Sequence, residues 1–173
     1  SGSMFSYAWE RMLLEMEATL NIYPEVKGIQ VLNDMGNYLF SRYRSQWIPD
    51  TPARRDLILR NLANWNVFSN SSPVEGITAA VRTFYDPNKK ISIYVFGDEF
   101  TGESIRRVVQ TVDQLNADNF GGERRVRIHA VGFPVQFIRP PQLQTTGVRF
   151  ATLMRELTYR NGGTFVGLND FRP

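Results

Sequence analysis

The chain has 173 residues, no cysteine and a net charge of +3, and its 20 lysines and arginines are interspersed with 17 acidic residues. This length fits one domain with a sizeable core, and the lack of cysteine excludes disulfides and thiolate metal sites. The mixed charges are typical of a solvated surface and argue against nucleic-acid binding, and no apolar run reaches the length of a membrane span. We expect one domain over residues 1–173, with no nucleic-acid partner and no membrane span.

The first half of the chain predicts helices and one hairpin. A short strand is expected at residues 28–32, followed by turn residues at 33–37 and a partner strand at 38–42. Neighbouring strands joined by so tight a turn are antiparallel. Residues 48–52 are predicted to be a loop. Apolar residues at helical spacing predict three helices in this half, over residues 7–20, over 53–65 and from Pro73 onward.

The second half of the chain alternates strands and helices. Residues 91–96 form an apolar run, which is typical of a strand buried between two helical layers. Further helices are expected at 103–115 and 151–160, and further strands at 126–133 and 164–168. The alternation predicts an α/β fold with three layers, namely a doubly wound, mostly parallel sheet with helices on both faces. We expect residues 38–42 to form one antiparallel edge of this sheet and 164–168 the other edge, with 91–96 in the interior.

Asp98 is the first candidate for a functional residue. Gly97 lets the chain leave the sheet, so Asp98 lies just past the carboxyl end of the predicted strand. Ligands of open α/β sheets bind at that edge. The alternative interpretation is that Asp98 or Glu99 caps the following helix.

Residues 134–147 are predicted to form a long irregular loop, and such loops are more often functional than structural. Phe137, Ile138 and Leu143 lie in it among prolines, which restrain the backbone and lower the entropy lost on binding. These three residues are therefore candidates for contact with a partner protein. The alternative is that their side chains fold back onto the domain.

Catalytic constellations are poorly supported. His129 is the only histidine and lies within a predicted strand, so the chain offers neither a zinc site nor a well-supported serine–histidine–acid triad. We therefore expect a protein that is not an enzyme. A Mg²⁺-dependent enzyme that uses Asp98 as a metal ligand stays an alternative.

Four stretches, taken in order, resemble the von Willebrand factor type A (vWA) domain family over nearly the whole chain. They are residues 1–4 before the first helix, 93–98, 126–133 and 161–166. The resemblance implies a domain that binds other proteins through a metal-ion-dependent adhesion site at the top edge of the sheet.

The resemblance also implies the ligands of that metal. Ser1 and Ser3 match the serines of the family's Asp-x-Ser-x-Ser motif, Ser72 stands where a threonine is expected, and Asp98 matches the acid of the third loop. Hydroxyl and carboxylate oxygens suit Mg²⁺. The first aspartate of the motif, and the central strand that carries it in the family, would precede residue 1, so we expect weak or absent Mg²⁺ binding. A cloning remnant at residues 1–3 would match the motif by chance and stays an alternative.

The resulting hypothesis is a protein-binding, adhesion-type module with a complete or degenerate metal site and an unidentified protein partner. An extracytoplasmic or membrane-anchored setting in a longer chain is favoured. A structural module whose ion site has decayed is the remaining alternative.

Overall fold

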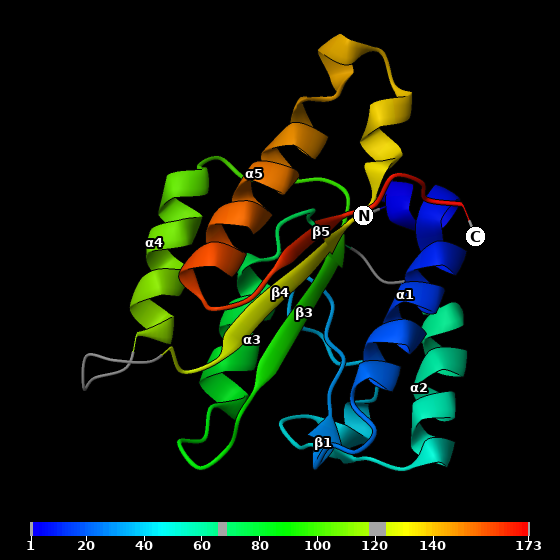
Figure 1. Cartoon of the computed structure of the whole chain (residues 1–173), viewed down its shortest axis with the longest axis vertical. Coiled ribbons are helices and arrows are strands. Elements are labelled where there is room, and N and C mark those ends of the chain that lie inside the picture. The colour runs from blue at the N-terminus through cyan, green and yellow to red at the C-terminus, as the bar shows by residue number, and fades with distance from the viewer. Residues whose placement is uncertain (1, 66–68, 118–123, 173) are drawn as a thin grey trace.

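The centre of the molecule is a sheet of three parallel strands in the order β3–β4–β5 (Figure 1). The protein is described from a computed structural model, which covers residues 2–65, 69–117 and 124–172. The strands span Ser92–Gly97 (β3), Arg127–Gly132 (β4) and Phe165–Gly167 (β5). The three strands predicted after residue 90 are therefore confirmed, as are their parallel direction and the edge position of the last one.

Helices cover both faces of this sheet (Figure 1). Within the described residues they are α1 (Trp9–Ile22), α2 (Pro52–Ala63), α3 (Val74–Phe84), α4 (Ile105–Asn116) and α5 (Thr145–Arg160). One core cluster joins α3, α4 and α5 to the sheet through Ile128 and the half-buried Ile93. A second cluster joins α1 and α2 to the opposite face, against Phe96 and Val131. The mixed α/β architecture is confirmed.

Local sequence explains where several helices begin. The Thr51 hydroxyl accepts a hydrogen bond from the Arg54 N–H at the start of α2, and Pro52 occupies the first turn, where a missing amide donor costs nothing. The Ser104 hydroxyl accepts from the Arg107 N–H and caps α4 in the same way. Asp98 and Glu99 therefore do not cap α4, and that interpretation was wrong.

The antiparallel strands lie apart from the main sheet. β1 (Gly28–Ile29) pairs with β2 (Ile48–Pro49) in a separate two-stranded sheet, so the predicted antiparallel edge strand of the main sheet was wrong. Residues 38–42 form only an isolated bridge at Tyr38, followed by a 3₁₀ helix over Ser41–Tyr43. The Gln30 side chain donates hydrogen bonds to the carbonyls of Tyr43 and Gln46, which holds the chain after residue 42 in a turn instead of a ladder.

Strand β3 lies at an edge of the parallel sheet, although we expected it in the interior. Helices cover its side chains on both faces, which explains why its sequence is apolar on both sides although the strand lies at an edge. The Ile91 carbonyl accepts from the Arg127 N–H (3.0 Å), and the Gly97 carbonyl accepts from the Phe133 N–H (2.9 Å). Odd-numbered residues of β3 therefore direct their backbone polar groups to β4, and even-numbered residues direct theirs away from it.

The segment predicted to be a long loop is largely helical. It forms two short 3₁₀ helices, η3 (Pro134–Ile138) and η4 (Pro141–Leu143), and α5 begins at Thr145, six residues earlier than predicted. Figure 1 shows this segment beyond the carboxyl ends of the strands, in yellow and orange. It therefore lies at the edge of the sheet where Asp98 also lies.

Candidate functional site

Three polar side chains from distant parts of the chain meet at the carboxyl end of β3. The Ser3 hydroxyl donates a hydrogen bond to Asp98 Oδ2 at 2.6 Å. The Gln136 amide Nε2 donates to the same carboxylate oxygen at 2.8 Å and to the Ser3 hydroxyl at 2.9 Å. Asp98 is 3% exposed and Gln136 is fully buried. This triangle of Ser3, Asp98 and Gln136 is the centre of the candidate site.

Neighbouring apolar residues hold the triangle in place. Ser3 immediately precedes the short helical turn η1 (Met4–Ala8), whose Met4 and Ala8 are buried in the α1–α2 core cluster. Gln136 lies in η3 beside Val135, which is buried in the same cluster, and η1 contacts η3. The polar contacts are therefore fixed by the packing of two helical turns, whose positions do not depend on loop flexibility.

A second group of hydroxyl–carboxylate pairs lies beside the triangle. The Ser71 hydroxyl donates to Glu99 Oε1 at 2.8 Å, and the Ser69 hydroxyl donates to Asp34 Oδ2 at 2.6 Å. Ser71 has a φ of +52°, a left-handed conformation that is uncommon for a residue other than glycine. Backbone strain of this kind is often found at functional sites.

Ser72, a predicted metal ligand, lines the same groove as Asp98 and Glu99. Its backbone N–H donates to the Asn70 side-chain oxygen at 3.0 Å. The structure therefore brings Ser3 into direct contact with Asp98 and places Ser72 in the groove that Asp98 also lines. Ser1, the remaining predicted ligand, lies outside the described residues.

The oxygen atoms of this site suit a hard cation, although they carry little charge. Ser3 offers a hydroxyl and Asp98 a carboxylate, and the buried Oε1 of Gln136 has no hydrogen-bond partner among the described residues. Mg²⁺ prefers such oxygen ligands and keeps several waters. No cluster of three or more histidine, cysteine or acidic side chains suited to a metal occurs in the described part of the chain. The chemistry of these donor atoms therefore fits Mg²⁺.

An exposed apolar patch lies on the segment that follows Gln136. Phe137 is 45% exposed, and Ile138 and Leu143 are each 56% exposed. Val148, in the first turn of α5, is exposed as well. These four residues are called the apolar patch below.

Gln136 is the site residue that sequence reasoning missed. A polar side chain between Val135 and Phe137, in a segment already singled out, was the available signal. A single glutamine carries no pattern by itself, and its burial depends on how η3 packs.

No protein family, curated protein or solved structure matches the chain. Its function must therefore be inferred from the site itself. Within the described residues, no helix combines the length and the apolar content needed to cross a lipid bilayer.

Proposed function

We propose that the protein is a binding module that docks a partner protein at the carboxyl edge of its sheet, in the manner of vWA domains. The observation that carries this proposal is the contact between Ser3 and Asp98, two residues 95 positions apart, at the edge where α/β sheets bind ligands. The apolar patch on the neighbouring segment would supply the apolar part of the docking surface.

Two further observations favour binding over catalysis. His129, the only histidine, stacks on Tyr94, and its Nδ1 accepts a hydrogen bond from the Thr164 N–H. These contacts fix the ring between strands, so it is not placed as a general base for Asp98. The side chain of Asp98 is itself held by two donors, which suits a stable ligand set better than a group that exchanges protons.

Mg²⁺ is the proposed cofactor of this surface. Ser3 and Asp98 would hold it together with Ser1 and Ser72, as the family resemblance implies. When bound, the ion would supply an electron-poor centre whose open coordination position accepts an acidic group of the partner.

Titration calorimetry with MgCl₂ tests the metal part of the proposal. We expect binding in the roughly millimolar range, because one carboxylate among neutral oxygens attracts the ion weakly. Asp98→Asn should abolish this binding, since it removes the charge and keeps the shape. Asp56→Asn, at a carboxylate that is 61% exposed on α2, is the matched control and should bind Mg²⁺ as the original chain does. Binding that survives Asp98→Asn would place the metal elsewhere, and no binding at saturating MgCl₂ would remove Mg²⁺ from the proposal.

The apolar patch is tested through stability. Replacing Phe137 and Ile138 together with serine should change the free energy of unfolding by less than about 0.5 kcal/mol per site, because both side chains are largely exposed. Thermal unfolding followed by circular dichroism measures this. A large loss of stability would mean that the two side chains serve the core, and the docking surface would then have to lie elsewhere.

A further inference from the structure

A deep apolar groove runs beside strand β3 and has a volume of about 1050 Å³. Its floor is the whole of β3, from Ser92 to Gly97. The surrounding walls are apolar side chains of α1, α2, α3 and β1, among them Met16, Leu62, Ile77, Phe84 and Ile29. Cavities that bind small ligands reach about 1000 Å³ only at the upper end of their range, so this groove has room for a large occupant.

The floor of the groove presents backbone groups that need hydrogen-bond partners. Since odd-numbered residues of β3 bond to β4, the N–H and C=O groups of Ser92, Tyr94 and Phe96 are directed into the groove. No described residue forms a backbone hydrogen bond with them across the groove. A row of such groups is a template for another strand.

The far wall of the groove is held firmly. The Arg55 guanidinium donates to the carbonyls of Leu20 and Tyr23, at the end of α1, and to both carboxylate oxygens of Asp50. These hydrogen bonds also lower the pKa of Asp50. The Arg55 bonds therefore fix α1 and α2 to each other, and a hydrogen bond between the hydroxyls of Tyr23 and Tyr94 (2.6 Å) ties the end of α1 to β3.

The two ends of the groove carry opposite charges. Lys89 and Lys90 lie just before the amino end of β3, where Lys89 is paired with Asp86 and Lys90 supplies the positive charge. Glu99 follows the carboxyl end of β3, and Asp34 lines the same groove. No ion pair among the described residues neutralises Glu99 or Asp34. An occupant with an acidic group near Lys90 and a basic group near the carboxylates is therefore favoured.

The geometry selects an extended strand over other occupants. A helix is about 10 Å wide, and its backbone N–H and C=O groups already bond to one another, so it could not pair with the backbone groups of β3. An apolar small molecule would also leave the N–H and C=O groups of β3 unsatisfied. A strand of about six residues spans roughly 20 Å, which matches the length of β3, and lies about 4.8 Å from its neighbour.

A second copy of the chain fits this requirement poorly. Its other parallel edge strand, β5, has only three residues, and two of them, Val166 and Gly167, are exposed. Strands β1 and β2 have two residues each. None of these edges supplies six residues that are apolar on both faces.

We propose that the groove binds an extended segment of a partner polypeptide, which adds to β3 as a parallel strand. The segment is about six residues long and apolar on both faces, with an acidic residue at its amino end and a basic residue at its carboxyl end. The groove reaches the Ser3–Asp98–Gln136 triangle at Asp98, which lines both, but it does not include the apolar patch and does not rest on a bound metal.

The test uses a capped, fluorescent peptide of sequence Glu-Val-Leu-Val-Leu-Lys and the intact chain. Fluorescence anisotropy measures binding, and hydrogen exchange followed by NMR reads each amide. We expect the peptide to slow exchange at Ser92, Tyr94 and Phe96 by at least about tenfold, because added-strand bonds protect these N–H groups. Ile93 and Val95 already bond to β4 and should not change.

Matched variants locate the peptide. Met16→Lys places a charge in the wall of the groove and should weaken peptide binding at least about tenfold. Leu14→Lys, on the same helix at a side chain that is 48% exposed, should bind as the original chain does. Equal affinity of both variants would show that the groove is not the site. Circular dichroism confirms that each variant is folded.

Peptide variants test whether the peptide forms backbone hydrogen bonds with β3 and in which direction it runs. A central proline removes one donor and should weaken binding about tenfold, and so should exchanging the glutamate and the lysine. Equal binding of either peptide would overturn the proposed parallel strand.

Dimerisation of the chain with the same amide protection would make a second copy the occupant. Protection only by a peptide fused to the amino end, never by the free one, would assign the groove to a strand of the same chain and contradict a separate partner.

Discussion

Strands β3 and β4 have the same length and pair over six residues, yet they are buried to different degrees. In β4, Ile128, Ala130 and Gly132 are buried, and each alternates with a more exposed residue. In β3, no residue is fully buried, and Ser92 is exposed. β4 has a neighbour at each edge, whereas β3 has a strand on one side and the groove on the other. Helices on both faces therefore do not bury a strand completely while one edge stays open.

The largest expected effect tests the difference in burial between β3 and β4 at one pair of residues. Ile128 and Ile93 face each other in register, but Ile128 is fully buried and Ile93 is half-buried. Ile128→Ala should lower the free energy of unfolding by about 3–4 kcal/mol, and Ile93→Ala by about 1–2 kcal/mol, because a partly exposed side chain loses less contact. Urea unfolding measures both. Equal losses would mean that β3 is as well covered as β4 in solution, so that the groove is filled.

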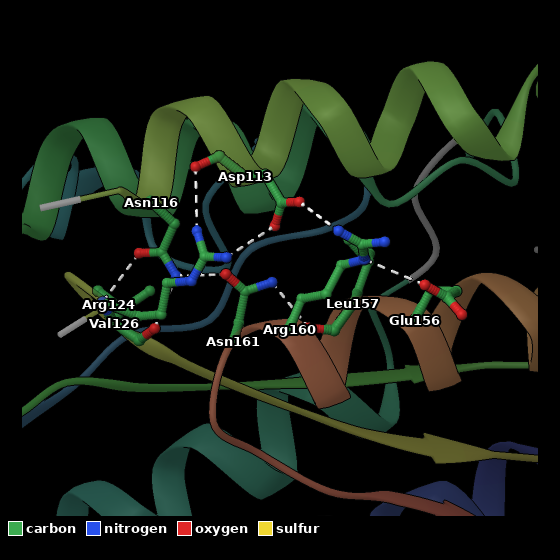
Figure 2. Close-up of polar contacts among 8 residues, drawn as sticks. All are labelled: Asp113, Asn116, Arg124, Val126, Glu156, Leu157, Arg160 and Asn161. Carbon is green, nitrogen blue, oxygen red and sulfur yellow. Dashed lines mark hydrogen bonds and ion pairs between the residues drawn. The ribbon is translucent and has the colours of Figure 1, made fainter. Parts of the chain in front are cut away.

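A smaller effect concerns the amino end of β4, where Asn116 of α4 holds the chain (Figure 2). Its Nδ2 donates to the Val126 carbonyl and to Asn161 Oδ1, both at 2.8 Å, and its Oδ1 accepts from the Val126 N–H at 2.9 Å. Asn116→Ala should cost about 2–3 kcal/mol, because it leaves buried backbone groups unsatisfied.

The control for this substitution is Asn64→Ala, at an exposed position after α2, which should cost less than about 0.5 kcal/mol. Chemical unfolding of both variants gives the difference. If Asn116→Ala costs no more than the control, water replaces the lost bonds and the amino end of β4 is more open than its burial indicates.

The smallest effect is a pH dependence that arises between the two strands. His129 of β4 stacks on Tyr94 of β3 with ring centres 4.7 Å apart. Burial, and secondarily the charge of Arg127, lowers the pKa of His129 below 6.5. Protonation therefore favours the unfolded chain, so the stabilisation is complete above the unfolded pKa of about 6.5 and is lost as the pH falls from there through the lower pKa of the folded state.

Urea unfolding between about pH 8 and pH 5 measures this slope, and His129→Gln should flatten it. Asp50, whose pKa is below 3.8, titrates outside this window. A slope that persists unchanged in His129→Gln would assign it to other groups.

Much of the fold follows from local patterns. Helical periodicity predicted all five α-helices in the described residues, and apolar runs predicted the three parallel strands. Such patterns report which faces of an element are buried, and they say nothing about which edges are paired. The sequence therefore predicted β3 as a strand but placed it wrongly in the interior.

The errors share a physical cause, which is contact between residues far apart in the chain. Residues 38–42 were predicted to be a strand, but side-chain bonds from Gln30 hold the following segment in a turn. Gln136 contacts Ser3 across 133 positions, and no local pattern reveals that. The position of Asp98 just after a strand, in contrast, was predicted because a strand end is a local feature.

The recessed position of β3 also bears on solubility. An exposed strand edge invites other sheets to add to it, and this is a common route to aggregation. Here the edge lies at the bottom of a groove whose far wall is α1 and α2, tied by Arg55. A single extended chain can enter such a groove, whereas the edge of a whole sheet is blocked by the helices. The same walls that shape the groove thus protect the free chain from growth into fibrils.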